Sequence, residues 1–278
     1  MPESEKKFKH FVMIRFFTFD DPKYPHDIYD PDFLAKQLVL AKNNALPSLD
    51  NQTNKNFELV FMLNDKFFDN PKYEFVFSTL KNSSALPLTF IKNSDRLQLI
   101  EDACNNYDFV ITSRMDFDDF LFKDAVADTQ SKVDECTDIL TYGYCKGFTY
   151  IRGNLYNAFT TKDLGHHSVL QSVILKSAFA KTIPFVGVYD FNHAKIKIRL
   201  KTFLEKNGVQ FAERMFQRNT SVNAFIYIRH EFSHYILTNN AGKPVLKLPK
   251  EKPLTTADIT KEQLAAEFGF HGELNSIE

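Results

Sequence analysis

Runs of apolar, β-branched residues alternate with amphipathic segments through the first part of the chain. Strands are expected at residues 11–17, 57–63, 88–91 and 109–112. Asp30 and Pro31 supply an N-cap and a first-turn proline for the helix after the first strand, and Pro47 closes that helix. Ser94 or Asp95 caps a second helix. Strands that alternate with helices predict an α/β fold with a largely parallel, doubly wound sheet.

The pattern changes after residue 125. Short antiparallel or mixed strands are expected at 139–142 and 147–151 with turns at Gly143 and Gly153, helices at about 168–181 and 191–206, and an alternating strand at 224–237. Thr260 and Gln263 form a capping-box pattern that opens a short terminal helix. We therefore expect a first half at 1–125, a second half of the same domain at 126–240 and a C-terminal extension at 241–278.

The strand expected at 109–112 leads into three carboxylates, Asp116, Asp118 and Asp119. In an open α/β sheet, ligands bind beyond the carboxyl ends of the strands. Carboxylates one residue apart can jointly hold a hard divalent cation, which neutralises the diphosphate of an activated donor. An acid-rich helix N-terminus is the structural alternative, but a cap needs one acid rather than three. The segment favours a metal-assisted transferase with a nucleotide-diphosphate donor.

Composition narrows the classes of function. Lys and Arg number 34 against 35 Asp and Glu among 278 residues, for a net charge of -1, so no overall field attracts nucleic acid. Cys104, Cys136 and Cys145 are widely spaced without a CxxC motif, which argues against a disulfide framework or a thiolate metal site. The N-terminus lacks an apolar signal core, and no apolar run approaches the roughly 18 residues of a membrane span. A cytoplasmic protein without a transmembrane segment is expected.

The segment from Thr112 to Leu121, with its Arg-x-Asp-x-Asp-Asp pattern from Arg114 to Asp119, resembles the metal-binding segment of GT-A glycosyltransferases. It is most similar to the bacterial family labelled putative rhamnosyltransferases. Arg15 in the first strand and the sequence Ala45-Leu-Pro-Ser-Leu, followed by Asn51-Gln52, are also similar. The resemblance implies a GT-A-like (Rossmann-like), mainly parallel sheet flanked by helices, with a mixed acceptor-side sheet. Donor binding then belongs to 1–125 and acceptor binding to 126–240.

The resemblance also implies roles for particular residues. Asp118 would ligate Mn²⁺ or Mg²⁺ directly, and Asp116 would contact the ribose of the donor or the metal through water. Arg114 is a candidate phosphate partner, because a guanidinium matches phosphate oxygens in a bidentate way. Asp65 and Arg15 would line the nucleotide pocket. A late histidine, His230 or His234, would complete the metal shell.

A direct-displacement transferase also needs a base for the proton of the acceptor hydroxyl. Asp190, just before the helix expected at 191–206, is the best candidate by position, although Asp190 or Asn192 equally suits a helix cap. His193, Asp163 and Glu213 remain alternatives for the base.

The implied reaction moves a hexose, rhamnose or another, from a UDP-, GDP- or dTDP-linked sugar to a hydroxyl of a bacterial surface polysaccharide such as capsule or lipooligosaccharide. Inversion at the anomeric carbon is expected, because the sequence offers a base and no evident covalent nucleophile. A lipid-linked glycan acceptor would bring the protein to the inner face of the cytoplasmic membrane as a peripheral protein.

Two rival functions belong to other classes. His230-Glu231-Phe-Ser-His234 satisfies HExxH, the zinc site of metallopeptidases, but that site requires a helix, whereas residues 225–230 alternate like a strand. On a strand the two histidines would lie about 13 Å apart, too far for one zinc ion. The adjacent His166 and His167 would point apart and are assigned to the acceptor site or the surface. A non-catalytic nucleotide-sugar binding protein is the other alternative.

Overall fold

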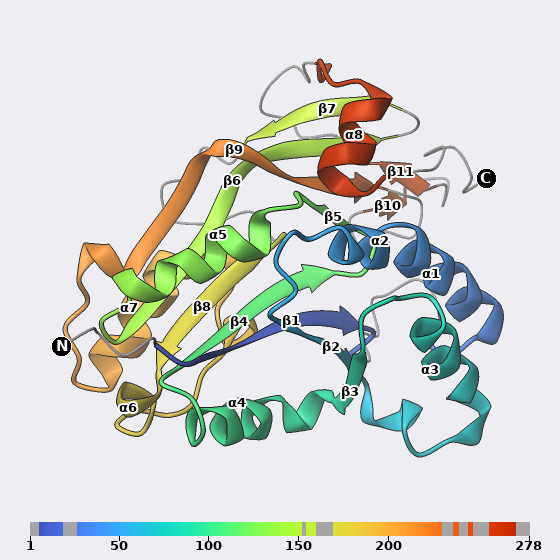
Figure 1. The fold of residues 1–278 in the computed structure, drawn as a ribbon. Helices are drawn as coiled ribbons and strands as arrows, with labels where there is room; N and C mark the ends of the chain where they lie inside the picture. The colour runs from blue at the N-terminus through green and yellow to red at the C-terminus, as the bar shows by residue number, and fades with distance from the viewer. Residues whose placement is uncertain are drawn as a thin grey trace.

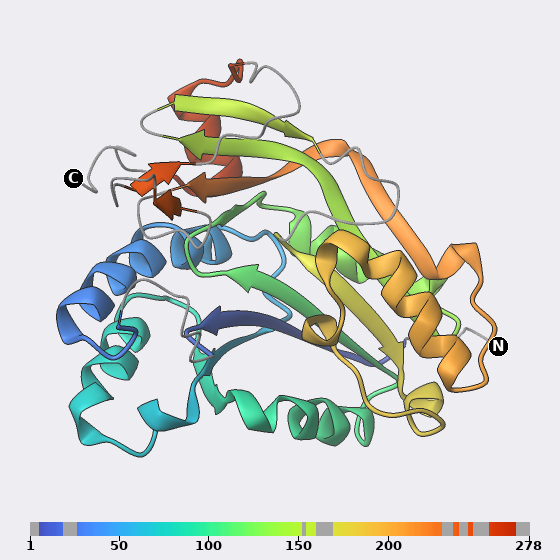
Figure 2. The same ribbon diagram turned by 180° about the vertical axis from the view of Figure 1, so that it is seen from behind.

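A curled mixed β-sheet flanked by helices forms the body of the molecule (Figure 1 and Figure 2). The computed structural model describes residues 6–18, 27–151, 154–159, 169–229, 236–238, 244–246 and 256–270. The strands are β1 (Phe8–Phe16), β2 (Glu58–Leu63), β3 (Leu88–Lys92), β4 (Phe109–Asp116), β5 (Phe120–Leu121), β6 (Ile139–Ile151), β7 (Asn154–Phe159), β8 (Gln171–Lys176), β9 (Phe216–Arg229), β10 (Ile236–Thr238) and β11 (Pro244–Leu246). The α-helices are α1 (Pro31–Asn43), α2 (Ala45–Asp50), α3 (Glu74–Lys81), α4 (Arg96–Cys104), α5 (Ala125–Ser131), α6 (Ser177–Ala180), α7 (Ile196–Lys206) and α8 (Lys261–Phe268).

The main sheet has the order β3-β2-β1-β4-β8-β6-β9-β5, and β7 pairs with β6. The first four strands in this order are parallel, as the sequence predicts. Beyond them, β8 is antiparallel to β4 and to β6, whereas β6 and β9 run parallel. The fold is therefore α/β with a parallel first half and a mixed second half, and the two halves share one sheet.

Alternation along β1 separates the two main cores. Val12, Ile14 and Phe16 face one core with α1, α2, α3 and α5, whereas Phe11 and Met13 face the other with α4, α6 and α7. Successive side chains of a strand point to opposite faces, so a strand covered on both sides is apolar throughout. This arrangement explains the almost uninterrupted apolar runs of the first half.

The beginning of α1 is confirmed, and its end differs from the prediction. The side chain of Asp30 accepts a hydrogen bond from the backbone N–H of Asp32, and Pro31 occupies the first turn. Pro47 does not close the helix, since it lies inside the short helix α2 that follows at once. A proline is tolerated in a first turn, where its missing N–H would have no helical partner.

The helix expected at about 168–181 is wrong for most of its length. Residues Gln171–Lys176 form β8, and only Ser177–Ala180 are helical. Val173, Ile174 and Leu175 are all buried, because β8 lies inside the sheet between β4 and β6. A strand buried on both faces loses its alternation, so periodicity alone cannot distinguish it from a buried helix.

The two short strands expected at 139–142 and 147–151 are one continuous strand, β6, with irregular pairing to β9 between Tyr144 and Phe148. Gly143 lies within the strand and makes no turn, and Gly153 falls outside the described residues. Gly147 is required for steric reasons, since an added Cβ would lie 2.5 Å from the carbonyl oxygen of Phe225. A glycine within a strand is thus a site of close backbone approach here rather than a turn.

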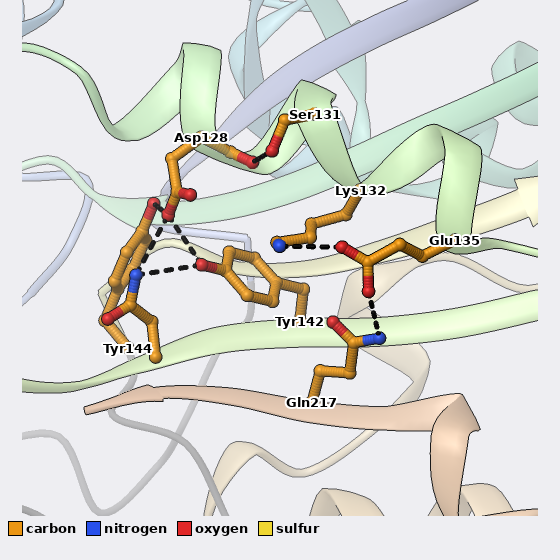
Figure 3. Close-up of polar contacts among 8 residues, drawn as sticks. Asp128, Ser131, Lys132, Glu135, Tyr142, Tyr144 and Gln217 are labelled. Atoms are coloured by element: carbon orange, nitrogen blue, oxygen red, sulfur yellow. Dashed lines mark hydrogen bonds and ion pairs between the residues drawn. The ribbon is translucent and has the colours of Figure 1, made fainter. Parts of the chain in front are cut away.

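Helix α5, which follows the acidic segment, is attached to the sheet by a polar cluster (Figure 3). The carboxylate of Asp128 accepts hydrogen bonds from the phenols of Tyr142 at 2.5 Å and Tyr144 at 2.7 Å and from the side-chain amide of Asn219 at 3.2 Å. Both tyrosines are buried, and burial followed by the negative charge of Asp128 raises the pKa of Tyr144. The two phenols therefore stay neutral donors to the carboxylate.

The C-terminal helix is confirmed as α8. The side chain of Thr260 accepts from the N–H of Gln263, and the Gln263 side chain accepts from the N–H of Thr260, as in a capping box.

The strand β9 begins at Phe216, eight residues before the start that alternation predicts. Among the residues that the structure describes, no helix is both long enough and apolar enough to cross a membrane.

Candidate active site

The acidic segment lies where β4 leaves the sheet. Asp116 is the last residue of β4 and pairs in register with Arg15, near the carboxyl end of the neighbouring parallel strand β1. Asp118 and Asp119 follow in the connection to β5. The side chain of Asn44, at the junction of α1 and α2, donates to the carbonyl oxygen of Asp118 at 2.8 Å. The sheet edge predicted to bind ligand therefore carries all three acids.

Two arginines hold Asp116. Its carboxylate oxygen Oδ1 lies 3.4 Å from Nη2 of Arg114 and 3.6 Å from Nη2 of Arg15. Burial favours the neutral acid, but the positive charges of Arg114 and Arg15 outweigh burial and lower the pKa of Asp116. Arg114 is buried at 6% exposure, and its Nε has no hydrogen-bond partner within the described part of the chain. Asp116 is thus ionised, and the Nε–H of Arg114 is a buried donor without a partner among the described residues.

A short segment after β8 covers the two arginines. Tyr189 lies in the 3₁₀ helix η5 (Val188–Asp190), with its ring centroid 5.2 Å from Cζ of Arg114 and 5.9 Å from Cζ of Arg15. Its phenol donates to the carbonyl oxygen of Met13 at 2.9 Å. His193 begins the next 3₁₀ helix, η6 (His193–Lys195), and burial followed by the nearby charge of Arg114 lowers the pKa of His193 to about 4. His193 is therefore neutral near pH 7.

Asp119 differs from the other two acids. It is completely buried, and its Oδ1 accepts a hydrogen bond from the N–H of Ile228 in β9 at 3.0 Å. Burial, followed by the charges of Asp118 and Asp116, raises the pKa of Asp119. Oδ2 of Asp119 has no partner among the described residues. Asp119 thus connects the acidic segment to β9, while Asp118 is half-buried.

The remaining predicted residues lie on neighbouring segments. Asp65 follows β2, the other neighbour of β1, and accepts a hydrogen bond from the hydroxyl of Ser94 at 3.2 Å. Asp190 accepts from the backbone N–H of Gly187 at 2.8 Å and forms an ion pair with Arg96. The cap of η6 is Asn192, whose side chain accepts from the N–H of Ala194. The carboxylate of Asp190 is therefore fixed in place by the chain around it.

The histidines of the HExxH pattern and the alternative base Asp163 lie outside the described residues. The chain that leads to His230 is a strand, since β9 extends to Arg229. Glu213, the other alternative base, forms an ion pair with Lys197 at 2.6 Å. In the part of the chain that the structure describes, no group of three His, Cys, Asp or Glu side chains is arranged to hold a metal ion. Asp116 and Asp118 nevertheless offer hard oxygen ligands, and Mg²⁺ is commonly bound by one or two carboxylates together with substrate phosphates.

The model of the family described as "Putative rhamnosyl transferase" matches residues 25–227, most of the chain. The chain belongs to the putative rhamnosyl transferase family. The match includes the acidic segment, Asp65 and Asp190, whereas Arg15 and α8 lie outside it. No curated protein matches the chain.

Several solved structures are similar to this member of the family. Staphylococcus aureus TarS 1-349 is 14% identical with a TM-score of 0.39, and the alignment covers 79% of this chain and 60% of that one. HddC from Yersinia pseudotuberculosis is 17% identical with a TM-score of 0.38, and the alignment covers 78% of this chain and 92% of that one. The chain thus spans well under two thirds of the TarS fragment.

Two residues near this site, Tyr189 and Gln171, are not predicted from the sequence. Tyr189 precedes a candidate base but carries no motif of its own, and only the fold brings its ring against Arg114. Gln171 pairs in register with Arg114, is completely buried, and has no hydrogen-bond partner for either side-chain atom among the described residues. The sequence signal for Gln171 is a polar residue at the start of an apolar run, which periodicity assigns to a helix.

Proposed function

We propose that the protein is a glycosyltransferase that moves a hexose from a nucleotide-diphosphate donor to a hydroxyl of a bacterial surface polysaccharide. The observation that carries the proposal is Asp116, held between Arg15 and Arg114 at the end of β4, in a member of the putative rhamnosyl transferase family. An open α/β sheet binds ligands at this edge. The family label favours rhamnose as the sugar, and UDP, GDP and dTDP are the candidate carriers.

Asp118 would hold Mn²⁺ or Mg²⁺ directly, and Asp116 would contact the metal through water or the ribose of the donor. When bound, such a cation neutralises the diphosphate that leaves with the nucleotide. His230 or His234 would complete the set of ligands. Arg114 and Arg15 already lie beside the Asp116 carboxylate, and their guanidinium groups would add positive charge next to the phosphates.

Arg114 is the stronger phosphate partner of the two. Its guanidinium is packed against Tyr189, and its Nε lacks a partner in the described structure. Arg15 and Asp65 would line the nucleotide pocket at the ends of β1 and β2.

We assign the base to Asp190. A direct displacement at the anomeric carbon inverts its configuration and requires a group that accepts the proton of the acceptor hydroxyl. Arg96 and the N–H of Gly187 orient the Asp190 carboxylate. His193, neutral near pH 7, is the alternative. A product with the same anomeric configuration as the donor would refute inversion. A lipid-linked acceptor would add peripheral association with the inner membrane face.

A thermal-shift panel tests the donor site. Each of UDP, GDP and dTDP and their hexose conjugates is added with Mn²⁺, Mg²⁺, Zn²⁺ or chelator, and one nucleotide should stabilise the protein only with Mn²⁺ or Mg²⁺. Asp118→Ala should lose that stabilisation and sugar transfer while unfolding at the wild-type temperature. Asp134→Ala is the matched control, because Asp134 is an exposed carboxylate in the 3₁₀ helix η4 (Lys132–Glu135), outside the acidic segment. Stabilisation by Zn²⁺ alone, or full turnover by Asp118→Ala, would contradict the proposal.

A further inference from the structure

Helix α8 lies outside the part of the chain that the family model matches, yet local signals define both of its ends. The capping box of Thr260 and Gln263 begins it, and Gly269, in the left-handed conformation with φ +68, ends it. A Cβ at position 269 would lie 2.9 Å from both Cβ of Asn51 and the carbonyl oxygen of Pro47. The C-terminal end of α8 therefore docks closely against α2, and only glycine fits that contact.

The buried face of α8 belongs to the same hydrophobic core as Phe120, the residue that follows the acidic segment. Leu264 and Phe268 share a hydrophobic core with Phe120, which is completely buried and adjacent to Asp119. The ring of Phe268 lies 6.1 Å from that of Phe148 in β6 and 6.4 Å from that of Phe122. Figures 1 and 2 both show α8 near α2, against the part of the sheet that contains β6 and β9.

Backbone contacts extend this anchoring. The N–H of Lys123 donates to the carbonyl oxygen of Glu267 at 2.8 Å, and their side chains form an ion pair at 3.1 Å. The ion pair is partly exposed and contributes little, whereas the backbone bond fixes position. On the other side of Lys123, its carbonyl oxygen accepts from the N–H of Thr53 at 2.8 Å. The chain after the acidic segment is thus held between α8 and the α2 region.

The two ends of the acidic segment are fixed unequally. Asp116 ends the eight-residue strand β4, which pairs with β1 and β8. Downstream, β5 has two residues and pairs only with β9. Packing by α8 compensates for that short strand. A ligand-bearing loop must be held closely in its productive geometry, and its supporting contacts decide whether it is.

We propose that α8 is a positioning element for the acidic segment, with Phe268 as its principal residue. It acts through Phe120 to hold Asp116 and Asp118 at the spacing that a divalent cation and a diphosphate require. The inference rests on the proposed function, since it concerns the cation site of that reaction. Contacts that orient metal ligands typically change metal affinity by about 10- to 100-fold when they are lost.

The test measures the Mn²⁺ concentration needed for half-maximal binding of the stabilising nucleotide-sugar, at a temperature where every variant is folded. Phe268→Ala and Leu264→Ala should raise this concentration about tenfold or more. Phe268→Leu, which keeps most of the buried volume, should restore it. Leu204→Ala in α7 is the matched control for Leu264→Ala, because Leu204 is also a buried helix leucine and packs in the core with α4 and α6, which contains no residue of the acidic segment or of β5. It should lower the unfolding temperature and leave the Mn²⁺ requirement unchanged.

The outcomes separate this inference from the proposed function. Wild-type protein that binds no nucleotide-sugar with Mn²⁺ or Mg²⁺ would overturn the proposed function and this inference with it. Normal wild-type binding, with a Mn²⁺ requirement in Phe268→Ala equal to that of Leu204→Ala, would overturn the role of α8 alone. If Phe268→Ala does not fold, Phe268→Leu and Leu264→Ala decide by the same comparison.

Discussion

The ring of Tyr189 lies 5.2 Å from the guanidinium of Arg114, and its phenol donates to the carbonyl oxygen of Met13 in β1. This pair links a segment from the second half of the chain to two strands of the first half. The flat ring packs against the buried guanidinium of Arg114, whose Nη2 lies 3.4 Å from the carboxylate of Asp116. Burial is the main reason why the pKa of Tyr189 rises to about 12, so the phenol stays neutral.

Two substitutions separate the contribution of the Tyr189 ring from that of its hydroxyl. Tyr189→Phe keeps the ring and should lower the free energy of unfolding by about 1 kcal/mol with donor affinity retained, because one hydrogen bond is lost. Tyr189→Leu also removes the cation–π contact and should weaken donor binding by about 1–2 kcal/mol. Urea denaturation measures the first quantity and isothermal titration calorimetry the second. Wild-type affinity in Tyr189→Leu would show that Arg114 needs no ring to hold it.

Asp119 should prove to be a structural residue. In Asp119→Asn the side-chain oxygen can still accept from the N–H of Ile228, and a buried acid next to Asp118 is removed, so stability should be equal to or above that of wild type. Asp119→Ala leaves that N–H unpaired and should cost about 1–3 kcal/mol. Chemical denaturation of the three proteins distinguishes these cases. Loss of stability in Asp119→Asn similar to that in Asp119→Ala would contradict the assignment.

The sequence predicts the parallel half of the fold well, because its signals are local there. Asp30 and Pro31 begin α1 as expected, and the apolar run before Asp116 is a strand that delivers its acid to the sheet edge. The second half departs from prediction where tertiary packing replaces local signals. Gln171 begins a strand covered on both faces, and Gly147 permits close approach to Phe225 within a strand that the sequence divides in two.

The site is predictable to the same extent. Arg114 and Asp116 lie on one strand that the apolar run predicts, but the alternating pattern does not determine that this strand pairs with the one that carries Arg15. Tyr189 and Phe268 could not be anticipated, since contacts across many residues of sequence bring them to the acidic segment. Their positions in the sequence indicate at most that they are buried. They do not indicate which residues they contact.

A buried histidine makes stability depend on pH. Gln130 donates through Nε2 to Nδ1 of His10 at 3.1 Å, so His10 must carry its proton on Nε2 and donate to the hydroxyl of Ser113 at 2.8 Å. Burial lowers the pKa of His10 to about 3 from 6.5. Below pH 6.5 His10 is protonated in the unfolded chain, whereas in the folded protein it stays neutral down to about pH 3. The free energy of unfolding therefore falls as the pH is lowered from 6.5 to about 3.

We expect this histidine to contribute a loss of about 1.4 kcal/mol per pH unit in the free energy of unfolding within that window. His10→Gln removes the titrating group, so its stability should decline less steeply than that of wild type between pH 6 and pH 4. Urea denaturation at several pH values in this range gives the slope of the free energy of unfolding against pH for each protein. The difference between the two slopes isolates His10, because the other titrating groups contribute equally to both. Parallel slopes would mean that His10 is protonated in the folded protein.

The buried amide of Gln171 has no hydrogen-bond partner among the residues that the structure describes. Because neither its Nε2 nor its Oε1 has a hydrogen-bond partner in the described structure, the folded state carries the cost of two desolvated polar atoms. Gln171→Met keeps the length of the side chain and removes both atoms, so the free energy of unfolding should rise by about 1–3 kcal/mol. Gln130→Met is the matched control, and it should lower the free energy of unfolding. Gln130 donates to His10 and to the carbonyl oxygen of Asn56 and accepts from Asn54, so its replacement removes these hydrogen bonds. Urea denaturation of the ligand-free proteins measures both, and a loss of stability in Gln171→Met would show that the amide is satisfied in solution.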